Sequence, residues 1–358
     1  MNYNNKRYTI VGVMSGTSLD GLDLVLCEYY KNENKWDFEV KKHTTLPYSH
    51  EWFERLKNAP TLAGLELITL HRQYGQWIGS AINNFLADEK KHCELIASHG
   101  HTVFHKPHEK VSFQAGDGAI IAAETGITTI SDFRTLDIAL GGQGAPLVPI
   151  GDALLFEQYD VCVNLGGFAN LSMETDDRRL AWDICPVNFV LNRLMMKLGK
   201  SYDDRGINGR KGKVITELYQ QLNQLPYYGY TAPKSLGQEW IENEFQPILD
   251  SYNDCEIHDV LRTCYAHFAD RITHDINLKN GSQVLFSGGG AKNDFLMALI
   301  AEKLKASVVI PNEVIVDYKE AIVFGFLGLL RWLKQPNCLA SVTGASSDAV
   351  SGVVHLIK

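Results

Sequence analysis

The sequence lacks several features that would each point to a particular class of protein. No hydrophobic run reaches the roughly 18 residues that a membrane span needs, so we expect no membrane association. The first ten residues carry no apolar signal-peptide core. The seven cysteines include no CxxC pair and no zinc-ligand spacing. These absences favour a cytoplasmic protein with reduced thiols and no structural zinc site.

Positive charge is also scarce. Lys and Arg number 34 against 42 Asp and Glu, which gives a net charge of −8. No basic stripe with interleaved aromatic residues is present, so we expect no nucleic-acid partner. A phosphorylated ligand would therefore be held by local loops and a metal ion rather than by bulk positive charge.

The two most familiar nucleotide-binding motifs are missing as well. Neither GxxxxGKS nor GxxxxGKT occurs, and no GxGxxG opens a strand–helix–strand unit. These absences exclude a P-loop and argue against a Rossmann dinucleotide site. A nucleotide would have to be bound by another kind of glycine-rich turn.

The most informative stretch that is present is residues 8–26, YTIVGVMSGTSLDGLDLVL. Two β-rich runs flank a turn in which Gly16, Thr17 and Ser18 would let backbone N–H groups and hydroxyls approach a phosphate. Asp20 beside them could hold a hydrated Mg²⁺. An ordinary hairpin with a polar tip has the same pattern, so this stretch alone leaves both interpretations open.

The plan of this hairpin recurs in the second half of the chain. Residues 159–172, YDVCVNLGGFANLS, repeat the strand, glycine turn and strand, and residues 284–300, VLFSGGGAKNDFLMALI, place a glycine turn before a helix that starts near Asn293. Three such turns over both halves predict two related domains sharing one nucleotide. The glycines of the later turns are Gly166, Gly167, Gly288, Gly289 and Gly290.

A domain boundary is expected where a Gly- and Pro-rich segment, GGQGAPLVP (141–149), precedes the restart of the hairpin pattern. We therefore expect an N-terminal domain of residues 1–155 and a C-terminal domain of residues 156–358, whose last residues could pack back on the first domain. Within the second domain, Gly325 and Gly328 lie in a strongly apolar helix and would permit close packing.

Asp183, in RLAWDICPVN, is the candidate catalytic base. We expect it between a short strand and a helix that begins near Pro186, at the mouth of a sheet. A carboxylate placed there could take a proton from a nucleophile. Asp at a strand-to-helix turn is also a common helix N-cap, and the spacing does not separate the two roles.

Other polar residues could contact a ligand. In SHGHTVFH, expected to be a polar turn after a strand at 95–97, His99 and His101 could bind substrate hydroxyls. Arg134 in DFRTLD could clamp a carboxylate or pair with a neighbouring aspartate. Gln143 is flanked by glycines that would admit a ligand. Glu320 is expected at the start of the apolar helix, where it would complement the helix dipole.

Together these motifs resemble the anhydro-N-acetylmuramic acid kinase family. The resemblance runs in order from about residue 8 to about residue 345, through MSGTSLDGLD, ASHGHTVFH, DFRTLDIALGGQGAPLVP, NLGGFANLS, KSLGQEW, SGGGAKN and KEAIVFG. The family belongs to the hexokinase–actin superfamily. The resemblance therefore implies an α/β fold with two duplicated domains and a nucleotide site in the cleft between them.

The resemblance also implies an activity. Such enzymes use ATP and Mg²⁺, open the anhydro ring of 1,6-anhydro-N-acetylmuramic acid with water, and phosphorylate O6. The product, N-acetylmuramic acid 6-phosphate, belongs to cell-wall recycling. Asp183 would be the general base that activates the water. The family also leaves room for a homodimer, which no residue pattern here indicates.

By the same resemblance, the remaining residues divide into two groups. Phosphate and nucleotide contacts would come from Gly16, Thr17, Ser18, Gly166, Gly167, Gly288, Gly289 and Gly290, with Asp20 near the metal. Sugar contacts would come from His99, Arg134, Gln143 and Glu320, with Arg134 facing the lactyl carboxylate.

The sequence departs from the family in three places. DICPVN stands where the family has DTGPGN or DTGPAN, so that Ile184, Cys185 and Val187 replace other residues. His101 replaces a glutamine, and Asp152 stands where a histidine is frequent. Two alternatives therefore remain: a kinase of the same fold for another amino sugar, or a non-catalytic sensor of sugar or nucleotide.

Overall fold

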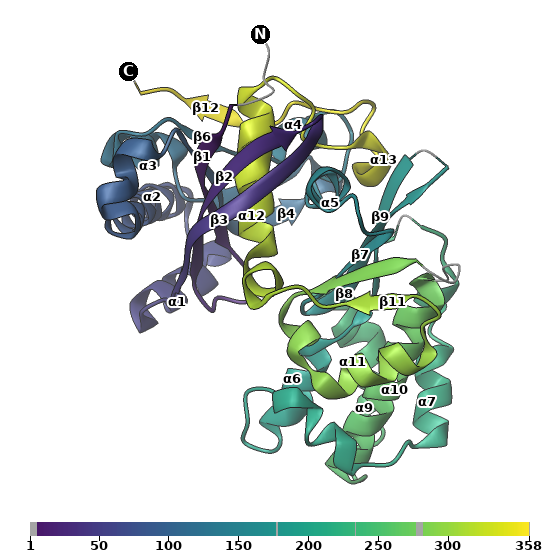
Figure 1. Cartoon of the computed structure of the whole chain (residues 1–358). Coiled ribbons are helices and arrows are strands. Elements are labelled where there is room, and N and C mark those ends of the chain that lie inside the picture. Colours follow the sequence, from purple (N-terminus) through teal and green to yellow (C-terminus); the bar gives the residue numbers. More distant parts are fainter. Residues whose placement is uncertain (1–5, 177, 233, 277–281, 358) are drawn as a thin grey trace. The chain divides into compact units, whose positions relative to one another are not determined.

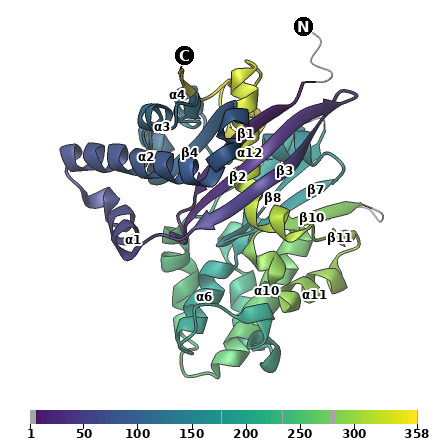
Figure 2. The ribbon, with the colours of Figure 1, turned by 60° about the vertical axis from the view of Figure 1, so that its left-hand side comes forward.

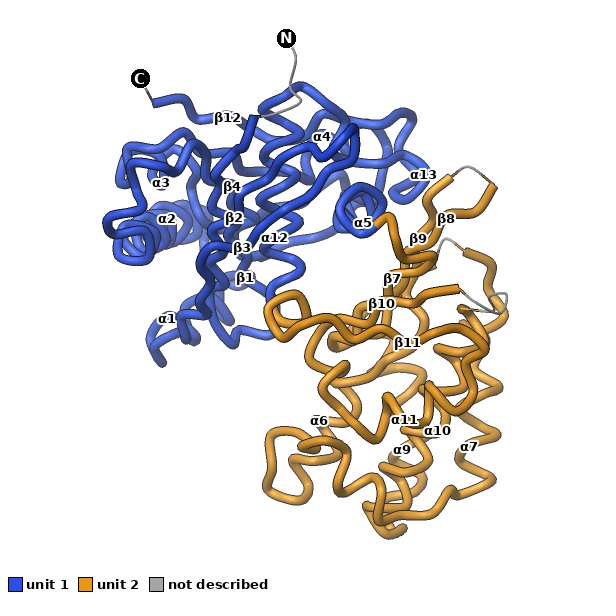
Figure 3. The backbone as a smooth tube through the Cα atoms, in the orientation of Figure 1, with its two compact units in different colours: residues 1–156, 318–358 blue, residues 157–317 orange. Residues whose placement is uncertain are grey.

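The computed structural model describes residues 6–176, 178–232, 234–276 and 282–357. The chain forms two compact units (Figure 3). Unit 1 contains residues 1–156 and 318–358, and unit 2 contains residues 157–317. The expected second domain of 156–358 differs from unit 2 at its C-terminal limit, because the segment from Tyr318 onward belongs to unit 1.

Unit 1 is built on a seven-stranded sheet with the order β12-β6-β4-β1-β2-β3, and β5 pairs with β4. β1 runs antiparallel to β2, and β2 runs antiparallel to β3. β4 is parallel to both β1 and β6. The strands are β1 (Tyr8–Ser15), β2 (Leu22–Asn32), β3 (Lys35–Leu46), β4 (Leu95–Lys106), β5 (Val111–Ala115), β6 (Thr129–Ser131) and β12 (Val353–His355).

Unit 2 repeats this arrangement in a five-stranded sheet with the order β11-β10-β7-β8-β9. Here β7–β8 and β8–β9 are antiparallel, and β10 is parallel to β7 and β11. Because β9-β8-β7-β10-β11 matches β3-β2-β1-β4-β6 in order and direction, the expected duplicated α/β fold is confirmed. The strands are β7 (Val161–Leu165), β8 (Phe168–Thr175), β9 (Arg178–Pro186), β10 (Gln283–Ser287) and β11 (Ser307–Val309).

Helices cover both faces of the unit 1 sheet. α2 and α3 lie on one side in both views (Figure 1, Figure 2), where residues such as Val11, Leu24 and Tyr74 form one core. α12 packs on the other face. The helices are α1 (His50–Lys57), α2 (Gly64–Leu86), α3 (Gly118–Thr125), α4 (Thr135–Ala139), α5 (Pro149–Leu155), α12 (Glu313–Trp332) and α13 (Ala340–Thr343).

The close packing expected of the apolar C-terminal helix is confirmed at its glycines. A Cβ added at Gly328 would lie 2.5 Å from the Cβ of Ala97, and one at Gly325 would lie 2.5 Å from the hydroxyl of Tyr29. Only a residue without a side chain fits at such distances. α12 therefore rests directly on β1, β2 and β4.

The labelled helices of unit 2 lie on one side of its sheet (Figure 1). They pack on the face formed by residues such as Val161, Val163 and Phe286. The helices are α6 (Asn188–Met196), α7 (Thr216–Asn223), α8 (Gln238–Trp240), α9 (Gln246–Asp250), α10 (Ile257–Ile276) and α11 (Asp294–Lys303), with a π-helical turn at Ile241–Phe245. Within the described residues, no helix is both long enough and apolar enough to cross a bilayer.

Short 3₁₀ turns connect these elements. They occupy Ala59–Thr61, Ala87–His92, Pro107–Glu109, Asp204–Gly206, Gly209–Lys211, Pro226–Gly229 and Gly289–Lys292.

Two local predictions are wrong. The segment SHGHTVFH is not a turn but the continuation of β4, because its backbone pairs with β5. Gly100, with a φ of +73°, accommodates the irregularity within the strand. The apolar helix begins at Glu313 rather than near 318, so Glu320 lies within α12 and not at its N-terminus.

Candidate active site

Asp183 lies inside β9 and not at a strand-to-helix turn. α6 begins at Asn188, and its N-cap position is Val187, which makes no side-chain cap. The structure therefore excludes the N-cap role for Asp183. Residue Ile184 forms a β-bulge, because Ala169 pairs with Cys185 while Asn170 pairs with Asp183. A bulge re-aims the neighbouring side chains, and bulges are frequent beside active sites.

Three residues on the open edge of β9 hold Asp183 in place. The Asp183 N–H donates to the carbonyl of Lys234 (3.0 Å), and its carbonyl accepts from the Tyr227 hydroxyl (2.6 Å). The Leu236 N–H donates to the carboxylate oxygen Oδ2 (2.8 Å). We call Tyr227, Lys234 and Leu236 the Asp183 brace. It engages the carboxylate oxygen Oδ2, and within the described residues no hydrogen bond reaches Oδ1.

The environment of Asp183 tunes its acidity. Burial raises the pKa of the Asp183 carboxyl to about 6, while the hydrogen bond from Leu236 N–H works in the opposite direction. A carboxyl with this pKa is mostly ionised at neutral pH and is still a stronger base than an ordinary aspartate. These are the properties of a general base.

The glycine turns of unit 2 fall into two kinds. A Cβ at Gly167 would meet the Phe189 ring at 2.3 Å, one at Gly288 would meet Asn164 Oδ1 at 2.4 Å, and one at Gly290 would meet the Leu165 Cβ at 2.7 Å. Packing excludes a side chain at Gly288 and Gly290, which also meet the Leu165 backbone at 2.9 Å, whereas the contact at Gly167 is with the exposed ring of Phe189. Gly289 has no atom within 4 Å of an added Cβ, and Gly166 has none closer than 3.4 Å. The backbone at Gly289 is therefore open to a ligand, whereas Gly166 leaves space for a ligand but its N–H donates to the Phe168 carbonyl (3.1 Å).

The end of the Asp183 strand is tied to the first of these turns. Val187 N–H donates to the Gly167 carbonyl (2.8 Å), and Asn188 N–H donates to the Gly166 carbonyl (3.3 Å). The candidate base and the candidate phosphate turn thus form one rigid segment.

A buried carboxylate that the sequence analysis missed supports the third glycine turn. Asp203, in the polar loop before α7, accepts hydrogen bonds from Asn208 N–H (2.8 Å), Gly209 N–H (2.9 Å) and the Tyr265 hydroxyl (3.1 Å). Tyr265 also accepts from the Asn293 side-chain amide (2.7 Å), and Asn293 caps α11 through Leu296 N–H. Asp203 therefore anchors the loop that follows Gly290, through partners far apart in the sequence.

The hairpin turn of unit 1 is open to solvent. Thr17, Ser18 and Asp20 are exposed, and the Ser18 hydroxyl donates to Asp20 Oδ1 (2.9 Å). Leu19 has a φ of +58°, so the tip bends sharply. The predicted phosphate-binding groups thus lie on an exposed tip beside the carboxylate of Asp20.

The predicted sugar residues of unit 1 cluster around Arg134. Its Nε and Nη2 donate to His99 Nε2 (3.1 and 2.8 Å), and its Nη1 donates to the Gly144 carbonyl (2.6 Å). Because a guanidinium only donates, His99 Nε2 must carry the lone pair, and Nδ1–H donates to the Gly100 carbonyl (2.8 Å). Burial and the nearby charge of Arg134 hold the pKa of His99 well below its usual range. His99 is therefore neutral.

Gln143 and Glu320 lie near the same cluster. Gln143 precedes Gly144, its side chain is exposed, and its N–H donates to the Thr343 carbonyl (2.8 Å). Glu320 is exposed on α12, and the positive charges of Arg134 and Lys319 favour its ionised form. The structure thus brings His99, Arg134, Gln143 and Glu320 into one region.

The neighbouring Asp137 does not pair with Arg134. It is fully buried and accepts hydrogen bonds from Gly144 N–H (2.7 Å), the Thr343 hydroxyl (2.7 Å) and the Cys338 thiol (3.1 Å). The salt bridge considered as an alternative role for Arg134 is therefore replaced by bonds to His99 and Gly144. Asp137 instead fixes the glycine-rich loop to the C-terminal segment.

Comparison with known proteins gives a family. A family model described as anhydro-N-acetylmuramic acid kinase matches residues 8–356. The chain belongs to the anhydro-N-acetylmuramic acid kinase family. Curated members that it resembles include those of Shewanella sp. strain ANA-3 (36% identity, 97% of this chain and 98% of that one) and Francisella tularensis subsp. novicida (33% identity, 96% and 98%). The chain is therefore a kinase.

Solved structures resemble the chain only distantly. A ROK family glucokinase from Streptomyces griseus aligns at 9% identity with a TM-score of 0.41, over 90% of this chain and 99% of that one. The component A of 2-hydroxyglutaryl-CoA dehydratase from Acidaminococcus fermentans aligns at 9% identity with a TM-score of 0.43, over 90% and 97%. Membership of the kinase family rests on the sequence matches.

The departures from the kinase family have specific surroundings. Ile184 is the bulge residue and is buried in the unit 2 core, as are Cys185 and Val187. Asp152 is buried and forms an ion pair with Lys319 (2.7 Å). His101 Nδ1 hydrogen-bonds Ser15 Oγ (3.1 Å), and burial lowers the pKa of His101 to about 4. The replaced positions thus lie in packed, satisfied environments.

The Ser15–His101 pair continues into α2 through two tyrosines that the sequence did not single out. Tyr48 OH lies 2.7 Å from Ser15 Oγ and 2.6 Å from Tyr74 OH. The hydrogen-bonded chain anchors the base of the Gly16–Asp20 turn to the core. Its members come from β1, β4, α2 and the loop between β3 and α1, so no local pattern predicts it.

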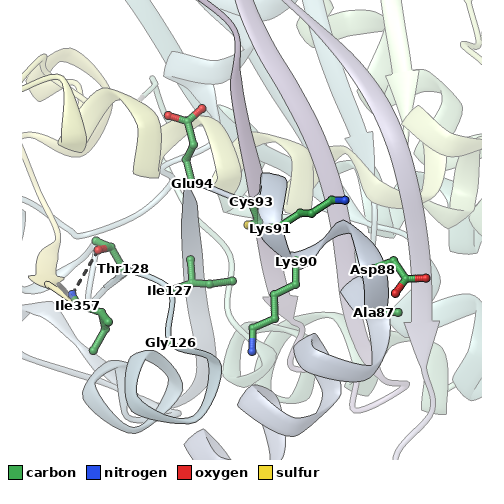
Figure 4. Close-up of a pocket in the computed structure, with 10 residues that line it drawn as sticks. All are labelled: Ala87, Asp88, Lys90, Lys91, Cys93, Glu94, Gly126, Ile127, Thr128 and Ile357. Atoms are coloured by element: carbon green, nitrogen blue, oxygen red, sulfur yellow. Dashed lines mark hydrogen bonds between the residues drawn. The ribbon is translucent and has the colours of Figure 1, made fainter.

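An open pocket of about 650 Å³ lies elsewhere on unit 1 (Figure 4). Its lining includes Lys90, Lys91 and Glu94, and also Thr128 and Ile357, whose N–H donates to the Thr128 hydroxyl (3.4 Å). Glu94 and Thr128 precede β4 and β6, so the pocket lies at the amino ends of these strands. Ligands of open α/β sheets bind at the carboxyl ends, where the candidate residues lie.

Proposed function

We propose that the protein is an ATP-dependent kinase that opens the anhydro ring of 1,6-anhydro-N-acetylmuramic acid with water and phosphorylates O6. The product is N-acetylmuramic acid 6-phosphate. The observation that carries the proposal is Asp183, a braced carboxylate with one free oxygen and a pKa of about 6. The choice of substrate is supported by the activity for which relatives that match nearly the whole chain are named.

Asp183 acts on water in this mechanism. Oδ1 takes one proton as the water oxygen bonds to the anomeric carbon from the face opposite the anhydro oxygen, as in inverting glycosidases. The bond between that carbon and O6 breaks, and O6 bonds to the γ-phosphorus of ATP as ADP leaves. The leaving oxygen therefore needs no separate acid, because phosphorus captures it. Asp183 later returns its proton to solvent.

Arg134 retains N–H donors that could bind the lactyl carboxylate. His99 and Gly144 use three of its five N–H groups, which leaves one on each terminal nitrogen. Two parallel N–H groups suit bidentate recognition of a carboxylate. In this proposal, His99, Gln143 and Glu320 contact the sugar around it.

The phosphates are assigned to the exposed glycine turns. Gly16, Thr17 and Ser18 would contact them from unit 1. The uncrowded turns at Gly166 and Gly289 would contact them from unit 2, together with their neighbours Gly167, Gly288 and Gly290. Asp20 supplies an exposed carboxylate on this turn, which fits Mg²⁺ held through water and phosphate oxygens. Bound Mg²⁺ would neutralise charge on the phosphates during transfer.

The decisive experiment is incubation with Mg²⁺, ATP and 1,6-anhydro-N-acetylmuramic acid in ¹⁸O-labelled water, followed by mass spectrometry. We expect a 6-phosphate with one ¹⁸O at the anomeric position, and almost none from Asp183→Asn. Product without ¹⁸O would contradict water as the nucleophile.

A panel of non-anhydro amino sugars in the same assay separates the alternatives. The reason for testing other sugars is the DICPVN segment, which differs from the family's usual sequence. Phosphorylation of another sugar in preference to the anhydro sugar would assign the chain to a different substrate. Ligand binding with no turnover of any sugar would identify a sensor.

A further inference from the structure

Four polar side chains form a row across the unit 2 sheet. Ser287 of β10 pairs with Asn164 of β7, Asn164 pairs with Asn170 of β8, and Asn170 pairs with Asp183 of β9. Residues paired directly across strands point to the same face of a sheet. The candidate base is therefore the last member of a continuous polar row on adjacent strands.

The row lies on the face opposite the helices of unit 2. Residues that alternate with it along the strands, including Val163, Leu171 and Phe286, form the core under those helices. Asn164, Asn170 and Asp183 are each half-buried. Half-buried polar groups on a sheet face can be reached by water or by a ligand, either of which can satisfy their hydrogen bonds.

Asn170 is the member next to the base. Directly paired residues of antiparallel strands have Cβ atoms about 4.5–5.5 Å apart, a separation that one water molecule can span between two polar side chains. Within the described residues, the amide of Asn170 makes no hydrogen bond to protein. The brace engages Asp183 Oδ2, so Oδ1 and the Asn170 amide are the groups available for a shared water.

We propose that Asn170 is a catalytic residue that orients the attacking water together with Asp183. The inference rests on the proposed function and adds a residue to it. Water has two hydrogens: one points to Asp183 Oδ1 and is transferred, and the other points to Asn170 Oδ1 and stays. This arrangement directs an oxygen lone pair at the anomeric carbon. The retained hydrogen becomes that of the new anomeric hydroxyl.

Asn164 provides a matched control. It has the same side chain on the same face, but it lies one strand further from Asp183, with strands spaced by about 4.8 Å. Its amide lies beside the glycine turns, 2.4 Å from the position of a Cβ at Gly288. We expect changes at Asn164 to affect ATP rather than water.

Competition between methanol and water tests the role directly. Methanol has only one O–H, so its methyl group would occupy the place where the second hydrogen of water meets Asn170. Asn170→Ala should lower kcat by about tenfold to a hundredfold through loss of orientation. It should also raise the ratio of methyl glycoside 6-phosphate to N-acetylmuramic acid 6-phosphate severalfold, while Asn164→Ala leaves that ratio unchanged. An unchanged ratio in Asn170→Ala, or an equal rise in both variants, would overturn the proposal.

A second measurement needs no sugar, so it tests the pairing of Asn170 with Asp183 separately from the proposed kinase activity. Asn170→Asp preserves shape but places a second carboxylate beside Asp183, which should raise the pKa of Asp183 by about one unit or more. The pKa can be followed by ¹³C NMR of labelled aspartate, with the signal assigned by its loss in Asp183→Asn. Asn164→Asp should shift it less. An equal shift, or none, would refute the adjacency even if the enzyme turned over. If wild type fails to open the anhydro sugar while the pKa shifts as expected, the proposed function fails and not the pairing.

Discussion

The two sheets have the same strand order, yet they place an acidic residue in opposite situations. In unit 1, Asp23 of β2 pairs with Thr45 of β3, whose hydroxyl donates to Asp23 Oδ1 (2.6 Å). In unit 2, Asp183 lies on the edge strand itself, faces Asn170, and receives only a backbone N–H on one oxygen. The acid of unit 1 has a side-chain hydroxyl as its partner, whereas the described residues give the acid of unit 2 a backbone N–H and no side-chain donor.

In the proposed mechanism, the topology of the sheet supplies the position of Asp183 and its local pairing supplies its reactivity. A β-bulge at Ile184 and the brace on the open edge of β9 distinguish Asp183 from Asp23. Neither feature changes the strand order. Duplicated folds can therefore divide work between their copies by small changes at one strand edge.

The largest expected effect is on Asp183. Asp183→Asn removes the base and should lower kcat by about 10²- to 10⁴-fold, the usual contribution of a positioned base. Asp23→Asn keeps an acceptor for Thr45 and should cost far less. Steady-state kinetics of both variants, with intact folding checked by circular dichroism, make the test. Equal losses would show that the two acids share the chemistry.

A smaller effect is expected at Arg134, where unit 1 should contribute binding rather than chemistry. Charge-assisted hydrogen bonds contribute about 1.5–3 kcal/mol, so Arg134→Gln should raise KM for the sugar by about tenfold to a hundredfold. The KM for ATP should stay within experimental error. Arg331→Gln, which removes only a bond to the Gly352 carbonyl, is the control. A drop in kcat without a change in sugar KM would contradict the division between the units.

The brace allows a sharper test of what distinguishes the two acids. Leu236→Pro removes the N–H that stabilises the carboxylate, so the pKa of Asp183 should rise from about 6 by about one unit. Because the base works only when ionised, the acid limb of kcat/KM should move to higher pH. Activity should then fall more at pH 6 than at pH 8.

Ser235→Pro is the control, one residue earlier in the same loop. Replacing the Leu236 peptide N–H with an ester oxygen gives the same test without a ring. If the acid limb stays in place in both changes at 236, the brace does not set the acidity of Asp183.

Sequence reasoning recovered what is local and missed what is distant. The glycine turns and the duplicated hairpin were predictable, because the pattern of each is contained in about fifteen consecutive residues. The setting of Asp183 was not, since its partners Tyr227 and Leu236 lie more than forty residues away. The second half of β4 was predicted to be a turn, because its residues are polar in the way that is typical of turns. The roles of Asp137 and Asp203 were missed for the same reason as the brace. Their hydrogen-bond partners are distant in the sequence and lie beside them only in the folded protein.

The smallest expected effect is on stability, and it should separate the two acids by its sign. The pKa of Asp183 in the folded protein, about 6, lies above the ordinary value of 3.8, so the folded state holds the proton more tightly than the unfolded state does. Ionisation therefore opposes folding progressively as pH rises from about 4 to about 6, and the cost is constant above that.

Asp183→Asn should consequently raise the free energy of unfolding by about 1–2 kcal/mol at pH 7 to 8, a figure reduced for the partial exposure of the carboxyl. The gain should shrink toward zero near pH 4. Asp23→Asn, which weakens an accepted hydrogen bond, should destabilise at neutral pH instead. Urea unfolding of both variants at pH 4.5 and 7.5 measures the difference. A destabilised Asp183→Asn protein at pH 7.5 would mean that Asp183 serves the fold as Asp23 does, and the contrast between the two sheets would no longer hold.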